Sequence, residues 1–334
     1  MRISVIGAGS FGTAMAVVAE RCGNEVLLWA HDPKVAEAIT STSTNSFYLP
    51  SIPIGPNVRA TSSLHEAAAF SDTIFMVVPS HHYRSILEQL RPDLKGRVQI
   101  ISGTKGIENE SLDRMSEITS AVLGPSLSAM ATLSGPTFAL EIARGDPSAA
   151  VVASRDEAFA QSIQKALSSA TFRVYHSTDV VGVELAGALK NVIAIASGVL
   201  EGLGLGSNTT AALITRGLHE ITRLGMALGG NAETFAGLAG MGDLVLTCTG
   251  SLSRNRSVGV SLGRGKSLDA ILSESRFVAE GIKTSKAASE LAARHGIEMP
   301  ITNEMFQVLY RNEPPRLAIQ RLMTRSLKAE ASRA

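Results

Sequence analysis

The sequence predicts an α/β fold in which a doubly wound, mostly parallel sheet is followed by an all-helical second domain. Three observations point to it. Short apolar runs alternate with helical patterns over the first half of the chain, a glycine-rich turn follows the first run, and after about residue 180 nearly every pattern is helical. A chain of 334 residues also exceeds the roughly 250–300 at which one core usually divides. We therefore expect one domain at residues 1–180 and another at 181–334.

Six apolar runs in the first half predict the strands, because each holds at least four apolar residues bounded by Gly, Pro, Asp or Ser. They are "RISVIGAG", "NEVLLWAHD", "DTIFMVVPS", "RVQIISGTKG", "SAMATLSGP" and "SAAVVAS". Continuous rather than alternating apolar runs are typical of strands covered on both faces, as in a parallel sheet. The segments "FGTAMAVVAERCG", "DPKVAEAIT" and "HHYRSILEQL" between them have helical spacing and polar caps. This alternation is the βαβ pattern of a doubly wound sheet.

The second half reads as a series of helices. Helical periodicity predicts them at 181–200, 208–228, 254–263, 280–295 and 301–311. The basic stretch after Pro315 is predicted as a solvated helix and a frayed end.

Composition excludes several classes of protein. A net charge of +1 gives no reason to expect nucleic acid or an acidic membrane as partner. The two cysteines, Cys22 and Cys248, form no CxxC pair, which favours a reducing compartment and argues against disulfides or a zinc site. A strand pattern begins at Arg2, so we expect no signal peptide, and the apolar stretch 185–200 is short for a membrane span and carries Lys190. We expect a cytoplasmic protein without stable membrane insertion and without a metal.

The turn "GAGSFG" predicts a dinucleotide site and makes the first domain Rossmann-type. Gly7, Gly9 and Gly12 follow a strand and open a helix, as in the dinucleotide fingerprint. Gly7 allows the tight turn, Gly9 lets the pyrophosphate approach the backbone, and Gly12 allows close packing of helix and strand. A second strand ends at Asp32, which favours NAD through a ribose hydroxyl, whereas the neighbouring His31 favours the 2′-phosphate of NADP. The choice between NAD and NADP stays open.

Four polar segments stand out from this background. Lys190 is the single ionisable residue between Leu185 and Leu200 and shares a helix face with small and apolar residues. Desolvation of such a lysine lowers its pKa into the range useful for proton transfer. Lys105 follows a buried strand, at the sheet edge where ligands bind. Asp243 either orients Lys190 or caps a helix, and "SLSRNRSVG" places hydroxyl and guanidinium groups at a helix start suited to phosphate or carboxylate.

Taken together, these motifs resemble one family along essentially the whole chain. The strings "GAGSFGTAMA", "NSFYLP", "VPS", "SGTKGIE", "LSGPTFALEIARG", "ELAGALKNVIAIASG", "GLAGMGDLVLTC", "SRNRSVG" and "VAEGIKT" occur in the order seen in bacterial NAD(P)-dependent glycerol-3-phosphate dehydrogenases. The resemblance implies an oxidoreductase that interconverts dihydroxyacetone phosphate and sn-glycerol 3-phosphate by hydride transfer, supplies phospholipid synthesis and forms a homodimer.

The resemblance also implies residue roles. Lys190 corresponds to the general acid/base. The substrate-binding positions are Lys105, Gly135, Thr137, Lys190, Asp243, Ser253, Arg254 and Asn255. The cofactor positions, besides Gly7, Gly9 and Gly12, are Ser10, Phe11, His31, Lys105, Ala139, Arg254, Val278 and Glu280.

Two rival interpretations remain at this stage. A related dehydrogenase with the same two-domain plan would act on another hydroxy acid. A dinucleotide-sensing regulator would show no turnover, although such a protein has no need of a buried proton donor.

Overall fold

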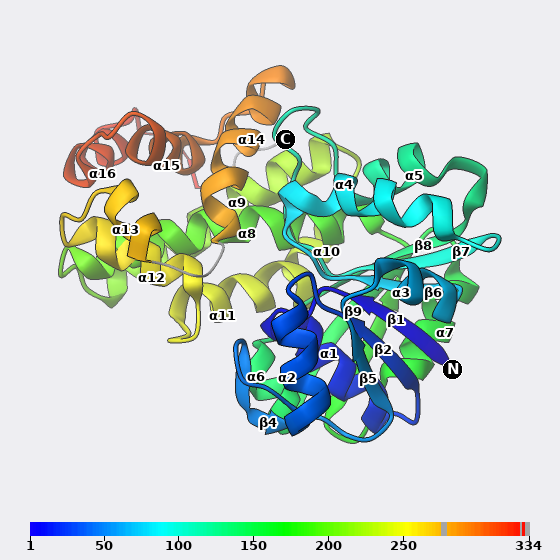
Figure 1. The fold of residues 1–334 in the computed structure, drawn as a ribbon. Coiled ribbons are helices and arrows are strands. Elements are labelled where there is room, and N and C mark those ends of the chain that lie inside the picture. Colours follow the sequence, from blue (N-terminus) through cyan, green and yellow to red (C-terminus); the bar gives the residue numbers. More distant parts are fainter. Residues whose placement is uncertain (275–278, 328, 331–334) are drawn as a thin grey trace.

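The computed structural model describes residues 1–274, 279–327 and 329–330 and contains one large sheet beside a group of long helices (Figure 1). In spatial order the sheet consists of β10 (Phe172–Ser177), β9 (Ser148–Ser154), β8 (Leu127–Ser134), β7 (Val98–Ser102), β6 (Thr73–Met76), β1 (Arg2–Ile6), β2 (Glu25–Trp29) and β5 (Val58–Thr61). Every neighbouring pair is parallel except β8 and β9, which are antiparallel. The predicted mostly parallel, doubly wound sheet is confirmed.

Helices cover both faces of the sheet, as the continuous apolar runs predict. The helices of this half are α1 (Ser10–Arg21), α2 (Pro33–Thr42), α3 (Leu64–Phe70), α4 (Ser80–Leu90), α5 (Met115–Leu123), α6 (Ala139–Arg144) and α7 (Glu157–Leu167). Residues alternate between the faces of β1: Ile3 and Val5 join the core with α1 and α7, whereas Ile6 joins the core with α3, α4 and α5. Burial on both faces explains why these strands have no polar side in the sequence.

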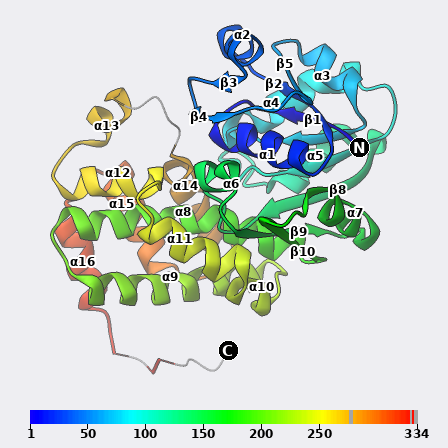
Figure 2. The same cartoon turned by 90° about the horizontal axis from the view of Figure 1, so that it is seen from below.

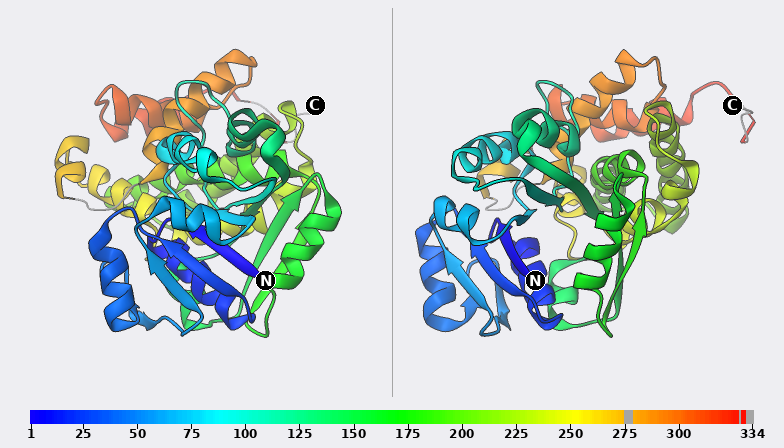
Figure 3. Two further views of the ribbon diagram at one scale, coloured as in Figure 1. Left: turned by 45° about the vertical axis from the view of Figure 1, so that its right-hand side comes forward. Right: turned by 90° about the vertical axis from the view of Figure 1, so that its right-hand side faces the viewer.

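All five helices predicted for the second half are present, with ends within two residues of those expected. The helices are α8 (Val180–Gly202), α9 (Ser207–Ala227), α10 (Ala232–Ala236), α11 (Asp243–Thr249), α12 (Arg254–Gly263), α13 (Leu268–Glu274), α14 (Glu280–Arg294), α15 (Pro300–Tyr310) and α16 (Pro315–Met323). The orange and red helices α14–α16 lie at the opposite end of the molecule from the first strands (Figure 3).

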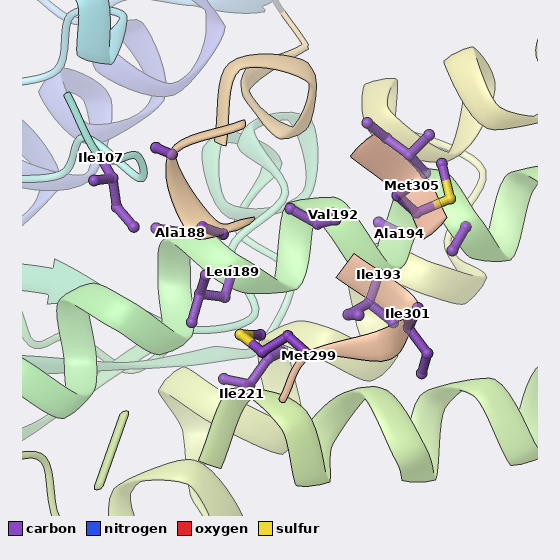
Figure 4. Packing of buried hydrophobic residues seen from close by; sticks show 14 of the residues in the cluster. Ile107, Ala188, Leu189, Val192, Ile193, Ala194, Ile221, Met299, Ile301 and Met305 are labelled. Atoms are coloured by element: carbon purple, nitrogen blue, oxygen red, sulfur yellow. The ribbon is translucent and has the colours of Figure 1, made fainter. Parts of the chain in front are cut away.

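Helix α8 forms the centre of this helical half. Figure 2 shows it between α12 and α9, and its apolar side chains pack against residues from α9, α15 and the segment before α15 (Figure 4). Leu189, Val192 and Ile193 are fully or almost fully buried there, in the same cluster as Ile221 and Met299. By length and hydropathy α8 resembles a membrane span, but 94% of its most apolar window is buried inside the protein. It is the core helix of the second half.

A small hairpin outside the main sheet was not predicted. Strands β3 (Thr44–Asn45) and β4 (Leu49–Pro53) pair antiparallel between α2 and β5. Two prolines in β4 obscure its strand character, because proline removes a backbone donor.

Candidate active site

The glycine turn has the geometry that its sequence predicts. Gly7 has a φ of +120°, and a Cβ there would lie 2.5 Å from the carbonyl oxygen of Val77, so a side chain is excluded both by conformation and by space. A Cβ on Gly12 would collide with the carbonyl oxygen of Gly7. A Cβ on Gly9, by contrast, would meet nothing within 4 Å. The open side of the turn at Gly9 therefore leaves the backbone accessible to a ligand.

A cavity of about 750 Å³ extends from this turn to the helical half. Its lining includes Gly7, Gly9, Ser10, Phe11, Gly12, His31, Asp32, Lys105, Thr137, Ala139, Lys190, Asn191, Thr247, Ser253, Arg254, Asn255 and Glu280. The first amides of α1 have no partner within the helix and, together with the helix dipole, attract an anion. The uncovered backbone at Gly9 and this helix start fit the pyrophosphate of a nicotinamide dinucleotide.

The two residues that favour different dinucleotides lie side by side in the cavity wall. His31 is exposed, and its ring packs edge-on against Trp29 with centroids 5.9 Å apart. One oxygen of Asp32 caps α2 by accepting a hydrogen bond of 3.0 Å from the amide of Lys34. Both residues line the cavity, so the geometry leaves both cofactors open.

Lys190 lies in the middle of α8 and is 5% exposed. Its Nζ donates hydrogen bonds to Oδ1 of Asp243 and, over 2.7 Å, to Oγ1 of Thr247. Burial lowers the pKa of Lys190 from 10.5 to about 8; the charge of Asp243 opposes this change and that of Lys105 adds to it. The amine is thus protonated near neutral pH but needs little free energy to lose its proton.

Lys105 approaches the same carboxylate from the sheet half. Its Nζ donates to Oδ2 of Asp243 over 2.6 Å and to the carbonyl oxygen of Gly135 over 3.1 Å, and it lies 5.8 Å from the ring centre of Phe11. Burial alone would raise the pKa of Asp243, but the charges of Lys105 and Lys190 outweigh it and lower the pKa. One ionised carboxylate therefore holds two amines at the inner end of the cavity.

Asp243 is the first residue of α11, directly after a π-helical turn at Leu238–Gly242. Its carboxylate points to the two lysines, and the described hydrogen bonds at this helix start include no side-chain cap. Asp243 was predicted either to orient Lys190 or to cap a helix, and its side chain contacts Lys190.

The segment "SLSRNRSVG" begins α12, as predicted. Ser253 caps the helix by accepting a hydrogen bond of 3.2 Å from the amide of Arg256, and Arg254 is the first helical residue. The Asn255 amide is occupied inside the protein: its Nδ2 donates to Oδ1 of Asn191 over 2.9 Å, and its Oδ1 accepts from the amide of Gly281 over 3.0 Å. Asn255 thus joins α8, α12 and α14 at the cavity wall.

The remaining predicted residues lie around the same space. Gly135 has a φ of +134°, and its carbonyl oxygen also accepts a hydrogen bond of 3.1 Å from the hydroxyl of Thr137. Ala139 begins α6. Glu280, at the start of α14, accepts hydrogen bonds from the amide and the hydroxyl of Ser80, 3.0 and 2.5 Å long. Val278 lies outside the described residues.

Sequence reasoning missed Thr247 and Ser80. Thr247 stands four residues after Asp243, so the two side chains meet on one helix face. Reading residues 243–249 as a helix would have found it, but this segment was equally compatible with a strand. Ser80 carried no such signal, because Glu280 reaches it across 200 positions of sequence. Among the described residues, no group of three or more His, Cys, Asp or Glu side chains is placed to hold a metal ion.

The fold and the cavity define the chain as a dinucleotide-dependent oxidoreductase with a buried amine at the end of its cofactor site. Two family models cover nearly all of it: the NAD-dependent glycerol-3-phosphate dehydrogenase N-terminus at residues 2–160 and the corresponding C-terminus at residues 179–320. The chain belongs to the NAD-dependent glycerol-3-phosphate dehydrogenase family, which confirms the resemblance.

Individual relatives agree with the family models. A glycerol-3-phosphate dehydrogenase [NAD(P)+] from Geobacter sulfurreducens is 52% identical over 330 residues, which is 98% of each chain. One from Koribacter versatilis is 50% identical over 332 residues, again 98% of each chain. The crystal structure of glycerol-3-phosphate dehydrogenase from Coxiella burnetii matches with a TM-score of 0.93 and 38% identity, covering 97% of this chain and 99% of that one.

Proposed function

We propose that this protein interconverts dihydroxyacetone phosphate and sn-glycerol 3-phosphate with NAD(H) or NADP(H). The observation that carries the proposal is the buried Lys190–Asp243–Lys105 cluster at the inner end of a cavity that starts at a dinucleotide-type glycine turn. A reduced nicotinamide, when bound, supplies the hydride for reduction of a ketone. The chain's own residues must then bind the substrate, orient it and supply a proton.

Lys190 acts as the proton donor and acceptor. As carbon gains the hydride, the ketone oxygen becomes an alkoxide and takes a proton from the ammonium of Lys190; in the oxidation the neutral amine removes it. The lowered pKa of about 8 suits both directions near neutral pH.

Asp243 and Thr247 orient that amine. Both accept hydrogen bonds from Nζ of Lys190, which restricts where the remaining N–H can point. Lys105 adds a second positive charge at the same carboxylate and so favours the developing alkoxide electrostatically.

The start of α12 anchors the substrate phosphate. Ser253 and Arg254 bring a hydroxyl and a guanidinium to this helix start, and Asn255 joins it to α8 and α14. A hydroxyl and a guanidinium at a helix N-terminus are good phosphate ligands. Gly135 and Thr137 complete the wall on the side of the sheet. Anchoring the phosphate fixes which carbon faces the nicotinamide.

The cofactor is assigned mainly to the sheet half, and Arg254, Val278 and Glu280 are assigned to it from the helical half. Gly7, Gly9 and Gly12 shape its phosphate site, and the other assigned positions are Ser10, Phe11, His31, Lys105, Ala139, Arg254, Val278 and Glu280. This division corresponds to a dinucleotide-binding domain at residues 1–180 and a substrate and catalytic domain at 181–334. The proposal further includes a cytoplasmic homodimer that supplies glycerol 3-phosphate to phospholipid synthesis.

The test compares wild type with Lys190→Met and with the control Lys165→Met, which removes an exposed lysine on α7. NADH and NADPH oxidation with dihydroxyacetone phosphate should fall about 10²–10⁴-fold in Lys190→Met and stay unchanged in the control. NADH binding, measured by quenching of the single tryptophan, Trp29, should persist in both variants. Equal turnover of Lys190→Met and wild type would remove Lys190 from its role. Turnover of hydroxy acids that lack a phosphate, at the same rate as glycerol 3-phosphate, would overturn the substrate assignment.

A further inference from the structure

The hairpin β3–β4 lies against the glycine turn and has no part in the function proposed so far. Helix α1, which follows the turn, packs beside β4 (Figure 2). The tip of the hairpin forms part of the cavity wall through Tyr48, Leu49 and Pro50.

Asn45 connects this hairpin to the turn and is fully buried. Its Nδ2 donates two hydrogen bonds of 2.8 Å, one to the carbonyl oxygen of Ala8 and one to Oγ1 of Thr13 in α1. Its Oδ1 accepts a hydrogen bond of 3.2 Å from the amide of Tyr48, at the tip of its own hairpin. The nitrogen of the Asn45 side chain therefore bonds to the turn and to α1, and its oxygen bonds to the hairpin.

The contact with Ala8 determines the direction of a neighbouring donor. The carbonyl of Ala8 and the N–H of Gly9 belong to one planar peptide unit and point in opposite directions. Holding the carbonyl oxygen on Asn45 therefore holds the Gly9 N–H in one orientation. Gly9 is the position at which the backbone is open to the cavity.

The hairpin itself is firmly placed, so it can act as a support. Leu49 and Ile52 are each 4% exposed and belong to the same core as Ala8. A second link runs the other way, since the hydroxyl of Ser10 donates over 2.9 Å to the carbonyl oxygen of Tyr48.

We propose that Asn45 is a positioning residue for the dinucleotide: it holds the Ala8–Gly9 peptide so that the Gly9 N–H is aimed at the pyrophosphate before the cofactor arrives. Preorganisation of this kind strengthens binding because the turn loses less freedom when the ligand binds. The inference rests on the dinucleotide binding of the proposed function and not on the identity of the substrate.

The variant Asn45→Ala tests this role because it removes both donors without adding charge beside the phosphate site. The control is Thr44→Ala, which removes a hydroxyl of the same hairpin. That hydroxyl lies 2.8 Å from the hydroxyl of Thr42, and within the described part of the chain its hydrogen bonding does not involve the glycine turn. We expect the Kd of NADH, measured by energy transfer from Trp29, to rise about tenfold in Asn45→Ala and to stay within about twofold in Thr44→Ala. The KM of dihydroxyacetone phosphate at saturating NADH should not change.

An unchanged Kd in a folded Asn45→Ala protein overturns the proposal. An equal rise in the Kd of NADH and in the KM of dihydroxyacetone phosphate also overturns it, because general loosening of the structure would weaken the binding of both ligands alike. If wild type itself binds no NADH, the proposed function fails, and this outcome is distinct from the failure of Asn45 alone.

A measurement on wild type covers the case in which Asn45→Ala does not fold. Amide hydrogen exchange with and without NADH should show the amides of Gly9 and Tyr48 gaining protection together, because Asn45 couples them. Protection of Gly9 with no change at Tyr48 would contradict the coupling.

Discussion

The amine of Lys190 lies between two opposing effects on its pKa. Removing an ammonium from water costs several kcal/mol, and a carboxylate in contact returns about 4 kcal/mol at the dielectric typical of such sites. The lowered pKa of about 8 shows that burial outweighs the attraction of Asp243. Without Asp243 the pKa of the buried lysine would be lower still, and a lysine at the surface would keep its ordinary, higher pKa and hold its proton more tightly.

This balance predicts opposite pH profiles for the two directions of the reaction. Reduction of the ketone needs the ammonium, so its kcat should fall as pH rises through about 8; oxidation needs the neutral amine, so its kcat should rise over the same interval. Steady-state rates from pH 6 to pH 10, at saturating cofactor and substrate, measure both limbs. Two profiles with the same direction of change near pH 8 would contradict the assignment.

At the scale of helices, glycines bring α8 and α12 into close contact. Gly198 and Gly202 on α8 face Gly259 and Gly263 on α12, and a Cβ at any of the four would lie under 3.0 Å from the backbone of the other helix. This contact sets the distance between Lys190 on α8 and the start of α12, where we propose that the substrate phosphate binds. The hydrogen bond between Asn191 and Asn255 joins α8 to the first turn of α12, which lines the cavity.

Gly259→Ala should therefore force the two helices apart. A Cβ there would lie 2.8 Å from the amide nitrogen of Val199 and closer still to the carbonyl oxygen of Ile195. We expect a loss of about 1–3 kcal/mol in the free energy of unfolding, measured with urea, and a higher KM for dihydroxyacetone phosphate. Gly96→Ala is the control, because a Cβ at Gly96 meets nothing within 4 Å. Equal stability of the two variants would show that the helices can move apart without cost.

At the scale of the whole molecule, a buried ion pair joins the sheet half to α8. Glu184 on α8 accepts hydrogen bonds of 2.8 Å from Arg114 and from the amide of Ser116, and one of 2.6 Å from the Ser116 hydroxyl. Burial raises the pKa of Glu184, although Arg114 and Ser116 oppose the change. The pair connects the start of α5 to the helix that carries Lys190.

The variant Glu184→Gln should show how much the ion pair between Arg114 and Glu184 contributes to the free energy of unfolding. It leaves Arg114, whose side chain is 12% exposed, without its buried partner, and we expect a loss of about 3 kcal/mol in unfolding free energy. The control Glu117→Gln removes the more exposed partner of the same arginine and should cost less than about 1 kcal/mol. Thermal unfolding of both variants gives the comparison. A larger loss for Glu117→Gln would contradict the proposed ranking.

The six strands with continuous apolar runs and five helices of the second half were predicted, whereas the edge strands β5 and β10 and helices such as α5 and α7 were not. In β10, buried and exposed residues alternate over its first four positions. Its polar residues made the segment resemble a loop in the sequence. Site residues could likewise be predicted only where they break a local pattern. Lys190 was predicted because it interrupts an apolar helix, whereas Ser80 and Asn45 resemble ordinary loop residues in the sequence.

The sequence by itself determined the six apolar strands, the change to helices after about residue 180, the glycine turn and the lone lysine in an apolar helix, because each depends on neighbours along the chain. The tertiary structure alone decided that Lys190 and Lys105 share Asp243, that Glu280 reaches Ser80 and that Asn45 holds Ala8. These contacts join segments 37 to 200 residues apart. Distances of that kind depend on how whole elements pack, and no local pattern of residue types encodes them.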